Sequence, residues 1–164
     1  MGNCFTYNRA GLSLWMSNGG TSVFLSVLLL AGSDLARSGW ECEMMVWLAD
    51  NDQAVFGAGT VGFDLDEIAW EPTQFATQKA FLLHVIDVAL TRHRWNALDY
   101  DPPVVADNLK EFRVIVEAYS LDNTTGPGKS DWAHEPTSLG KCVRHEVFVH
   151  ARGCLLCHDM SITL

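Results

Sequence analysis

Four potential metal ligands lie close together near the end of the 164-residue chain. Cys142 and His145 form a C-x2-H pair, and eight residues later Cys154 and Cys157 form a C-x2-C pair. Thiolate sulfur and imidazole nitrogen are the ligands that Zn2+ prefers, and each x2 spacing lets two side chains reach one ion from a single tight turn. The spacing C-x2-H-x8-C-x2-C therefore predicts a zinc site.

This segment resembles the short zinc knuckles of zinc-ribbon-like and rubredoxin-like modules over residues 141–158. The resemblance implies a tetrahedral site whose four protein ligands leave no position for water, so that the zinc is structural. A glycine often follows the first knuckle in such modules, and Glu146 stands there in this chain. His150 and His158 are neighbouring histidines that could replace one of the four ligands.

Instead of binding zinc, the same cysteines could be thiols without a metal, or they could serve one of two redox functions. Cys154-x-x-Cys157-His158 matches the attachment motif of c-type haem, with Met160 as a candidate axial ligand, but only six residues follow His158, too few to wrap a porphyrin. The second redox alternative is a disulfide between Cys154 and Cys157. Such redox pairs usually accompany a βαβ pattern, and none is visible in this sequence. An odd total of five cysteines, three of them clustered, favours a reduced compartment and a metal.

A glycine motif earlier in the chain could indicate a nucleotide site. Gly57-Ala-Gly59-Thr-Val-Gly62 matches the G-x-G-x-x-G pattern of dinucleotide-binding turns. Phe63-Asp-Leu-Asp-Glu follows it, which places three carboxylates where the pyrophosphate would lie, and Pro72 ends any helix early. We therefore interpret these glycines as a bulged strand or one that another backbone approaches closely.

The densest acidic cluster of the chain comprises Asp64, Asp66, Glu67 and Glu71. The whole chain has 20 Asp and Glu against 11 Lys and Arg, a net charge of -9, which argues against sequence-independent binding of nucleic acid because that depends on cations. The cluster is either a solvated surface that aids solubility or a docking face for a cationic protein.

An enzyme is the alternative interpretation of the acidic half. Asp64-x-Asp66-Glu67 offers oxygen ligands for a divalent cation, and His84 and Asp87 lie one helical turn apart, where the histidine could act as a base. Neither pattern is specific, because carboxylates near a helix start complement the helix dipole and i,i+3 pairs are common on solvated faces. A metal-dependent hydrolase of unknown substrate is therefore the alternative function.

The elements before Pro72 are predicted to be strands. The segment around residues 12–14 and the apolar run at residues 22–30 are expected to pair as a hairpin through an Asn-Gly-Gly turn. The apolar residues at 40–49 fit both the strand period and the helix period, and we interpret this segment as a strand. Residues 54–63 suggest a second hairpin.

Two helices are predicted after Pro72. Apolar residues from Phe75 to Leu90 recur at helical spacing, with Thr73 as the expected cap. Asp101 followed by two prolines is expected to open a second helix, and the two should form a hairpin.

No membrane span is predicted. The longest apolar run, residues 23–32, is shorter than the roughly 20 residues that a transmembrane helix needs. Only one positive side chain, Arg9, precedes it, which argues against an export signal, so we expect a cytoplasmic protein.

These patterns predict an α+β fold in which an N-terminal antiparallel sheet of roughly four or five strands is packed by a helix hairpin, with a C-terminal zinc knuckle. We expect an α+β domain at residues 1–120, a loop or linker at 121–140 and a zinc-knuckle segment at 141–164. The favoured function is a small acidic, non-catalytic binding protein with a structural zinc. It would dock on and occlude a basic partner protein, as immunity proteins and nuclease inhibitors do, by analogy of size and charge.

Overall fold

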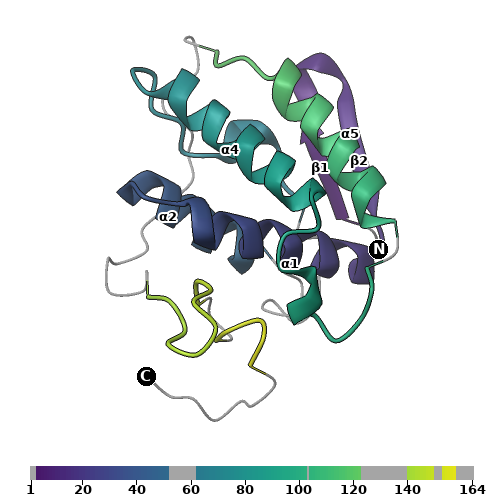
Figure 1. Ribbon diagram of the computed structural model, residues 1–164. Coiled ribbons are helices and arrows are strands. Elements are labelled where there is room, and N and C mark those ends of the chain that lie inside the picture. Colours follow the sequence, from purple (N-terminus) through teal and green to yellow (C-terminus); the bar gives the residue numbers. More distant parts are fainter. Residues whose placement is uncertain (1–2, 52–61, 103, 123–139, 150–152, 158–164) are drawn as a thin grey trace.

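The computed structural model (Figure 1) describes residues 3–51, 62–102, 104–122, 140–149 and 153–157. The strands of this part are β1 (Asn3–Tyr7) and β2 (Leu12–Met16), and its longer helices are α1 (Asn18–Leu35), α2 (Gly39–Asp50), α4 (Phe75–Leu90) and α5 (Val105–Ala118). Short 3-10 helices occupy Asn8–Ala10 (η1), Leu65–Glu67 (η2) and Trp95–Ala97 (η3). The predicted α+β class, with an N-terminal antiparallel sheet and a helix hairpin, is confirmed.

Helix α1 is the centre of the packing. It contacts α2, α4, α5 and β2, and α5 also packs against both strands (Figure 1). Every residue from Val27 to Ser33 is buried, so this helix meets protein on all its sides. The C-terminal segment, yellow-green in Figure 1, lies against the end of α1 and carries Val147 and Phe148 into the core cluster.

The N-terminal sheet is a hairpin of β1 and β2, paired antiparallel with Phe5 opposite Leu14. Gly11 adopts a left-handed conformation, φ 66°, in the connection, which glycine permits without steric penalty. Asp64 extends the far edge of β1 through a parallel bridge to Thr6. The predicted sheet of four or five strands was therefore too large: two strands form it within the described residues, because two expected strands are helices.

The predicted pairing of residues 12–14 with residues 22–30 was wrong. Ser17 accepts a hydrogen bond from the backbone N–H of Gly20, so the Asn-Gly-Gly sequence forms the first turn of α1 rather than a β-turn. The apolar run is helical, and its even burial explains the error, because a helix buried on all sides lacks the polar stripe that distinguishes it from a buried strand.

The predicted strand at residues 40–49 was also wrong, since these residues form α2. A capping box starts the helix: the Ser38 hydroxyl accepts from the Glu41 backbone N–H, and the Glu41 carboxylate accepts from the Ser38 backbone N–H. Buried Met44, Met45 and Leu48 then face α1 and the rest of the core. The second predicted hairpin, residues 54–63, lies mostly outside the described residues.

The predicted helix hairpin is confirmed as α4 and α5, which pack against each other. Their expected starts were wrong. The residue preceding α4 is Gln74, which makes no side-chain capping bond, and α5 begins at Val105 after Val104, whose φ is 52°. Asp101 pairs instead with Arg92. None of the helices in the described part combines the length and the apolar character that a bilayer span requires. The division at residues 120 and 140 stays a prediction.

The close packing of α1 on α2 makes Gly32 sensitive to substitution. A Cβ at this position would lie 1.6 Å from Sδ and 2.9 Å from Cγ of Met45, a fully buried side chain that would have to shift within the core. Gly32→Ala should lower the free energy of unfolding by about 1–3 kcal/mol, measured by chemical denaturation.

Two controls isolate the clash as the cause. Gly19→Ala in the first turn of α1, where a Cβ meets nothing within 4 Å, should be neutral or stabilising by up to about 1 kcal/mol. In a Met45→Ala background the penalty of Gly32→Ala should disappear. An equal penalty with and without the Met45 side chain would contradict this account of the helix contact.

Candidate metal centre

Cys142 and His145 lie on a tight turn between two short extended segments. Lys141 and Phe148 form an antiparallel bridge, and the backbone N–H of Cys142 donates to the carbonyl of Val147 at 2.9 Å. The N–H of Glu146 donates back to the carbonyl of Cys142 at 2.7 Å, which closes the turn. Glu146 has φ 54°, so the position where knuckles often have glycine does adopt the left-handed conformation here.

The second turn carries Cys154 and Cys157. The backbone N–H of Cys157 donates to the carbonyl of Cys154 at 3.1 Å, and the N–H of Leu156 points at the Cys154 sulfur at 3.4 Å. Gly153, at φ 93°, directs the chain into this turn. Metals bind cysteine through the thiolate form of its sulfur.

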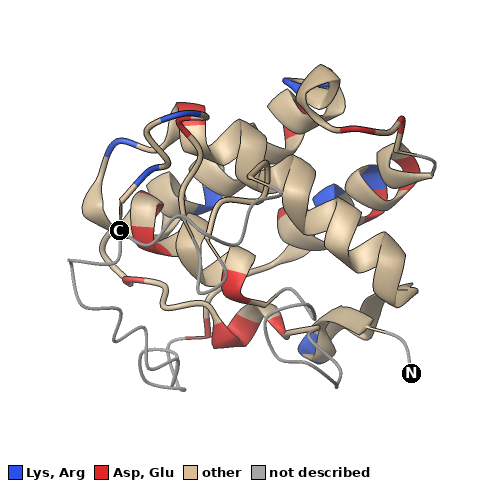
Figure 2. Ribbon diagram, turned by 90° about the horizontal axis from the view of Figure 1, so that it is seen from below, with Lys and Arg blue, Asp and Glu red and all other residues tan. Residues whose placement is uncertain are grey.

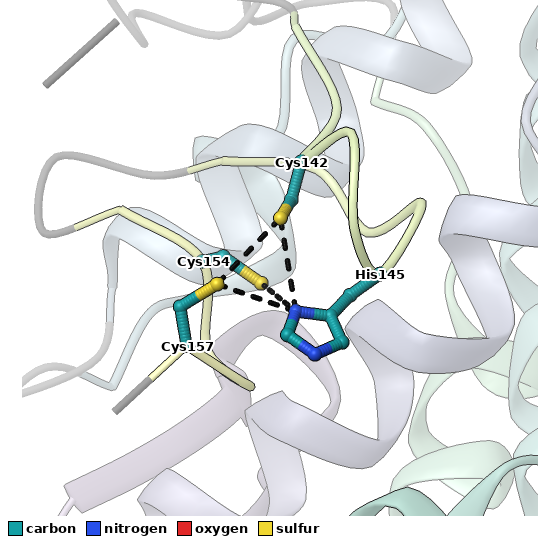
Figure 3. A group of neighbouring side chains, drawn as sticks. All are labelled: Cys142, His145, Cys154 and Cys157. Atoms are coloured by element: carbon teal, nitrogen blue, oxygen red, sulfur yellow. Dashed lines mark hydrogen bonds between the residues drawn. The ribbon is translucent and has the colours of Figure 1, made fainter. Parts of the chain in front are cut away.

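The two turns face each other and bring all four predicted ligands together (Figure 3). Nδ1 of His145 lies 3.7 Å from the sulfur of Cys142, 3.5 Å from that of Cys154 and 3.3 Å from that of Cys157. The sulfurs of Cys142 and Cys157 are 3.6 Å apart, and all four ligand atoms lie within 4.8 Å of one another.

These separations match a tetrahedral ion site. Zinc bonds of about 2.3 Å to sulfur and about 2.0 Å to nitrogen give tetrahedron edges of about 3.5 Å between nitrogen and sulfur and about 3.8 Å between two sulfurs. A disulfide would need sulfurs about 2.05 Å apart, and the three cysteines of the site are free thiols. The residues could therefore hold one metal ion, and their donor set suits zinc. His150, His158 and Met160 lie outside the described residues.

Two of the thiols differ strongly in acidity. Burial alone would raise the pKa of Cys142, but hydrogen bonds from the backbone N–H groups of Arg144 and His145 and from neighbouring side chains outweigh it and lower this pKa to about 6. Burial and the hydrogen bond with Cys142 raise the pKa of Cys157 to about 11. Cys142 is thus the readier of the two to ionise, and a bound divalent cation would supply the charge that deprotonates the other thiol.

Three residues from the body of the protein hold the first turn in place. Ser33, fully buried near the end of α1, accepts a hydrogen bond from the Phe148 backbone N–H at 3.1 Å, and its carbonyl accepts from Lys141. Arg94 donates to the carbonyl of His145 and also pairs with Asp34, 3.3 Å away. The turn that carries Cys142 and His145 is thereby fixed to α1 and to the loop after α4.

Gly153 permits a clean test of the turn geometry. Its φ of 93° is strained for any residue with a side chain, yet a Cβ there would meet nothing within 4 Å, so a substitution acts through the backbone alone. Gly153→Ala should weaken zinc binding by about tenfold or more, measured by competition with a chromophoric chelator. Glu146→Gly removes a left-handed non-glycine residue and should bind zinc at least as tightly as the wild type. Equal affinities for Gly153→Ala and the wild type would contradict this geometry.

The predicted partner-binding carboxylates have mostly internal roles. Asp64 accepts from the Thr6 hydroxyl at 2.7 Å and from the backbone of Asn8 and Asp66, and it forms a capping box with Glu67 at the start of η2. Glu71 is exposed, and its carboxylate has no hydrogen bond or ion pair among the described residues. Of the four, Glu71 is thus the carboxylate left for an outside partner.

Asp66 is held by Arg9 and Tyr119. The guanidinium of Arg9 donates to both carboxylate oxygens, at 2.8 and 3.1 Å, and the hydroxyl of Tyr119 donates at 2.9 Å. The hydrogen bond from Arg9 holds the pKa of Asp66 below its usual range, and burial together with Asp66 raises the pKa of Tyr119. These contacts connect η1, which contains Arg9, and η2, which contains Asp66, to Tyr119 at the end of α5.

Of the pair considered for base catalysis, Asp87 is held by an ion pair with another helix. His84 is exposed on α4, while Asp87 pairs with Arg113 of α5, with oxygen and nitrogen 2.6 Å apart. Most of the glycine motif lies outside the described residues, but a Cβ on Gly62 would lie 1.8 Å from the carbonyl oxygen of Cys4. The predicted close approach of another backbone is confirmed at Gly62, although this residue does not lie in a strand.

The anchors Ser33, Asp34 and Arg94 were not predicted from the sequence. Arg94 lies 51 positions from His145 and Ser33 lies 115 positions from Phe148, and no local pattern marks such pairings. Comparison of the chain with protein-family models, with curated proteins and with solved structures finds no match.

Proposed function

We propose that Cys142, His145, Cys154 and Cys157 hold a structural Zn2+. The observation that carries this proposal is the set of four ligand atoms within 4.8 Å of one another, with separations of 3.3–3.7 Å around Nδ1 of His145. Three thiolates and an imidazole fill the four positions of a tetrahedral zinc, so no position remains for an activated water. The ion would fasten the second turn to the first, which α1 already anchors.

Substitution by Co2+ tests the ligand set. Cobalt bound tetrahedrally by thiolates absorbs strongly in the visible and near ultraviolet, and zinc should displace it with loss of that absorption. Cys4→Ser/Cys42→Ser leaves the proposed ligands intact and should give the same spectrum. A spectrum of octahedral cobalt, or one that depends on Cys4 or Cys42, would contradict the assignment.

For the protein as a whole we propose an acidic, non-catalytic binding function in which it docks on and occludes a basic partner protein, such as a nuclease or toxin domain. The net charge of -9 supports this proposal, because opposite charge accelerates and selects association. Figure 2 shows Asp and Glu spread over several elements of the described part. The closed metal site supports a structural rather than a catalytic use of the ion.

Isosteric neutralisation tests this proposal, with the melting temperature of each variant measured first. Glu67→Gln keeps an acceptor in the capping box, and Glu71→Gln alters an exposed residue. Asp64→Asn keeps only one of the two oxygens that accept from Thr6, Asn8 and Asp66 and is expected to cost some stability. Asp66 is left unchanged because it binds Arg9. The triple variant should bind a basic nuclease domain more weakly than the wild type does, and added salt should weaken wild-type binding. Affinity insensitive to both the salt and the triple substitution would contradict the docking proposal.

A further inference from the structure

We propose that the metal centre is a reversible peroxide-sensitive site, in which oxidation joins Cys142 to Cys157 in a disulfide and releases the zinc. The proposal rests on the structural zinc proposed above and adds a regulatory chemistry to it. Its basis is the geometry of two thiols that approach each other from opposite turns.

The two sulfurs are close enough to bond after a small movement. Sγ of Cys142 lies 3.6 Å from Sγ of Cys157, and a disulfide needs about 2.05 Å, so the sulfurs must approach by about 1.5 Å. Both are carried on short turns in the same half-buried site (Figure 3). Side-chain rotation supplies such a shift without separating the turns.

The two cysteines differ in access. Cys142 is buried, with 8% of its surface exposed, while Cys157 is half-buried and so open to a small solute. We therefore assign the first reaction to Cys157 and the second to Cys142. With zinc bound both sulfurs are thiolates, so exposure decides which of them meets the oxidant first.

The oxidant is a hydroperoxide, represented by hydrogen peroxide. The Cys157 thiolate attacks one peroxide oxygen, so that an S–O bond forms, the O–O bond breaks and hydroxide leaves; the sulfur becomes a sulfenic acid. The Cys142 thiolate then attacks that sulfur, so that the S–S bond forms and the S–O bond breaks with loss of a second hydroxide. Two thiolates, one peroxide and two protons give one disulfide and two waters.

Loss of two of four ligands removes the basis for holding the ion. His145 and Cys154 remain, and two ligands do not complete the tetrahedral set that zinc needs. The new disulfide still joins the two turns, so the ligands stay near one another. Reduction by a dithiol should therefore restore the site and its zinc.

The test treats the zinc-loaded full chain with hydrogen peroxide and follows free zinc with a chromophoric chelator. The alkylated protein is then digested, and its cross-linked peptides are identified by mass spectrometry. We expect release of one zinc per chain together with a Cys142–Cys157 link, and recovery of both after reduction with zinc present. Retention of zinc under peroxide, or a link between Cys154 and Cys157 instead, would overturn the proposal.

A matched pair of variants separates the two cysteines of the second turn. Cys154→His and Cys157→His each keep four zinc ligands by type, and only the former keeps the proposed reactive pair. After their zinc content is measured, Cys154→His should release zinc under peroxide and Cys157→His should retain it. Equal release by the two would contradict the assignment. A wild type without metal before oxidation would overturn the structural zinc itself, which distinguishes that failure from this one.

Discussion

Removal of the metal is expected to lower the melting temperature of the protein by about 8–16 °C. Free zinc at a thousandfold excess over its dissociation constant stabilises the native state by about 4 kcal/mol. For a chain of this size each kcal/mol corresponds to about 2–4 °C. Calorimetry of the zinc-loaded protein, before and after dialysis against a strong chelator under reducing conditions, measures the difference.

The stabilisation of the fold by zinc should depend on pH. Zinc binding displaces thiol protons, so the stabilisation should decline as the pH falls and protons compete for the sulfurs.

Removal of the metal should first affect the region around the site. Amide exchange should increase first at the backbone N–H groups of Cys142 and Val149, which are hydrogen-bonded in the turn, and only later in α1. Cys154→Ser/Cys157→Ser should already have the lower melting temperature and should not respond to chelator. Identical melting of the chelated and zinc-loaded wild type would contradict the role of the metal.

Gly62→Ala is expected to destabilise the fold by about 3 kcal/mol or more. A Cβ at Gly62 would lie 1.8 Å from the carbonyl oxygen and 2.4 Å from the nitrogen of Cys4, and backbone atoms cannot rotate away as a side chain can. The substitution would force apart the strand-like contact in which the Thr6 N–H donates to the Phe63 carbonyl at 2.9 Å. Denaturant titration measures the loss.

The matched control is Gly39→Ala at the start of α2, where a Cβ meets nothing within 4 Å. Its effect should stay within about 0.5 kcal/mol. A Gly62→Ala protein as stable as this control would contradict the close approach to Cys4. Packing against β1 would then not be the reason for a glycine at this position.

The cluster of four candidate metal ligands was predictable because its geometry is local in sequence. Each ligand pair is separated by two residues and lies on one turn, so the spacing of Cys142 with His145 and of Cys154 with Cys157 carries most of the information. The contacts that fix the site to the body were not predictable. Ser33 and Arg94 come from α1 and from the loop after α4, and their roles follow from tertiary packing alone.

The errors in secondary structure have identifiable physical causes. The apolar run in α1 is buried on all sides, which removes the period that would have distinguished helix from strand. Complete capping boxes were a better local signal, unlike the single capping residues expected at Thr73 and Asp101. Ser38 with Glu41, and Asp64 with Glu67, have the spacing of a capping box, and both pairs form one. The capping box of Asp64 and Glu67 also gives a structural role to two carboxylates that the sequence alone had suggested as part of a docking face.

The most direct test of the proposed zinc site is the metal content of the protein. Elemental mass spectrometry at a known protein concentration should find one zinc per chain in the wild type, purified under reducing conditions without chelator. Cys154→Ser/Cys157→Ser should contain none, and Cys4→Ser/Cys42→Ser should contain as much as the wild type. A wild type that holds no stoichiometric metal, or zinc that persists in the Cys154→Ser/Cys157→Ser protein, would contradict the proposed site.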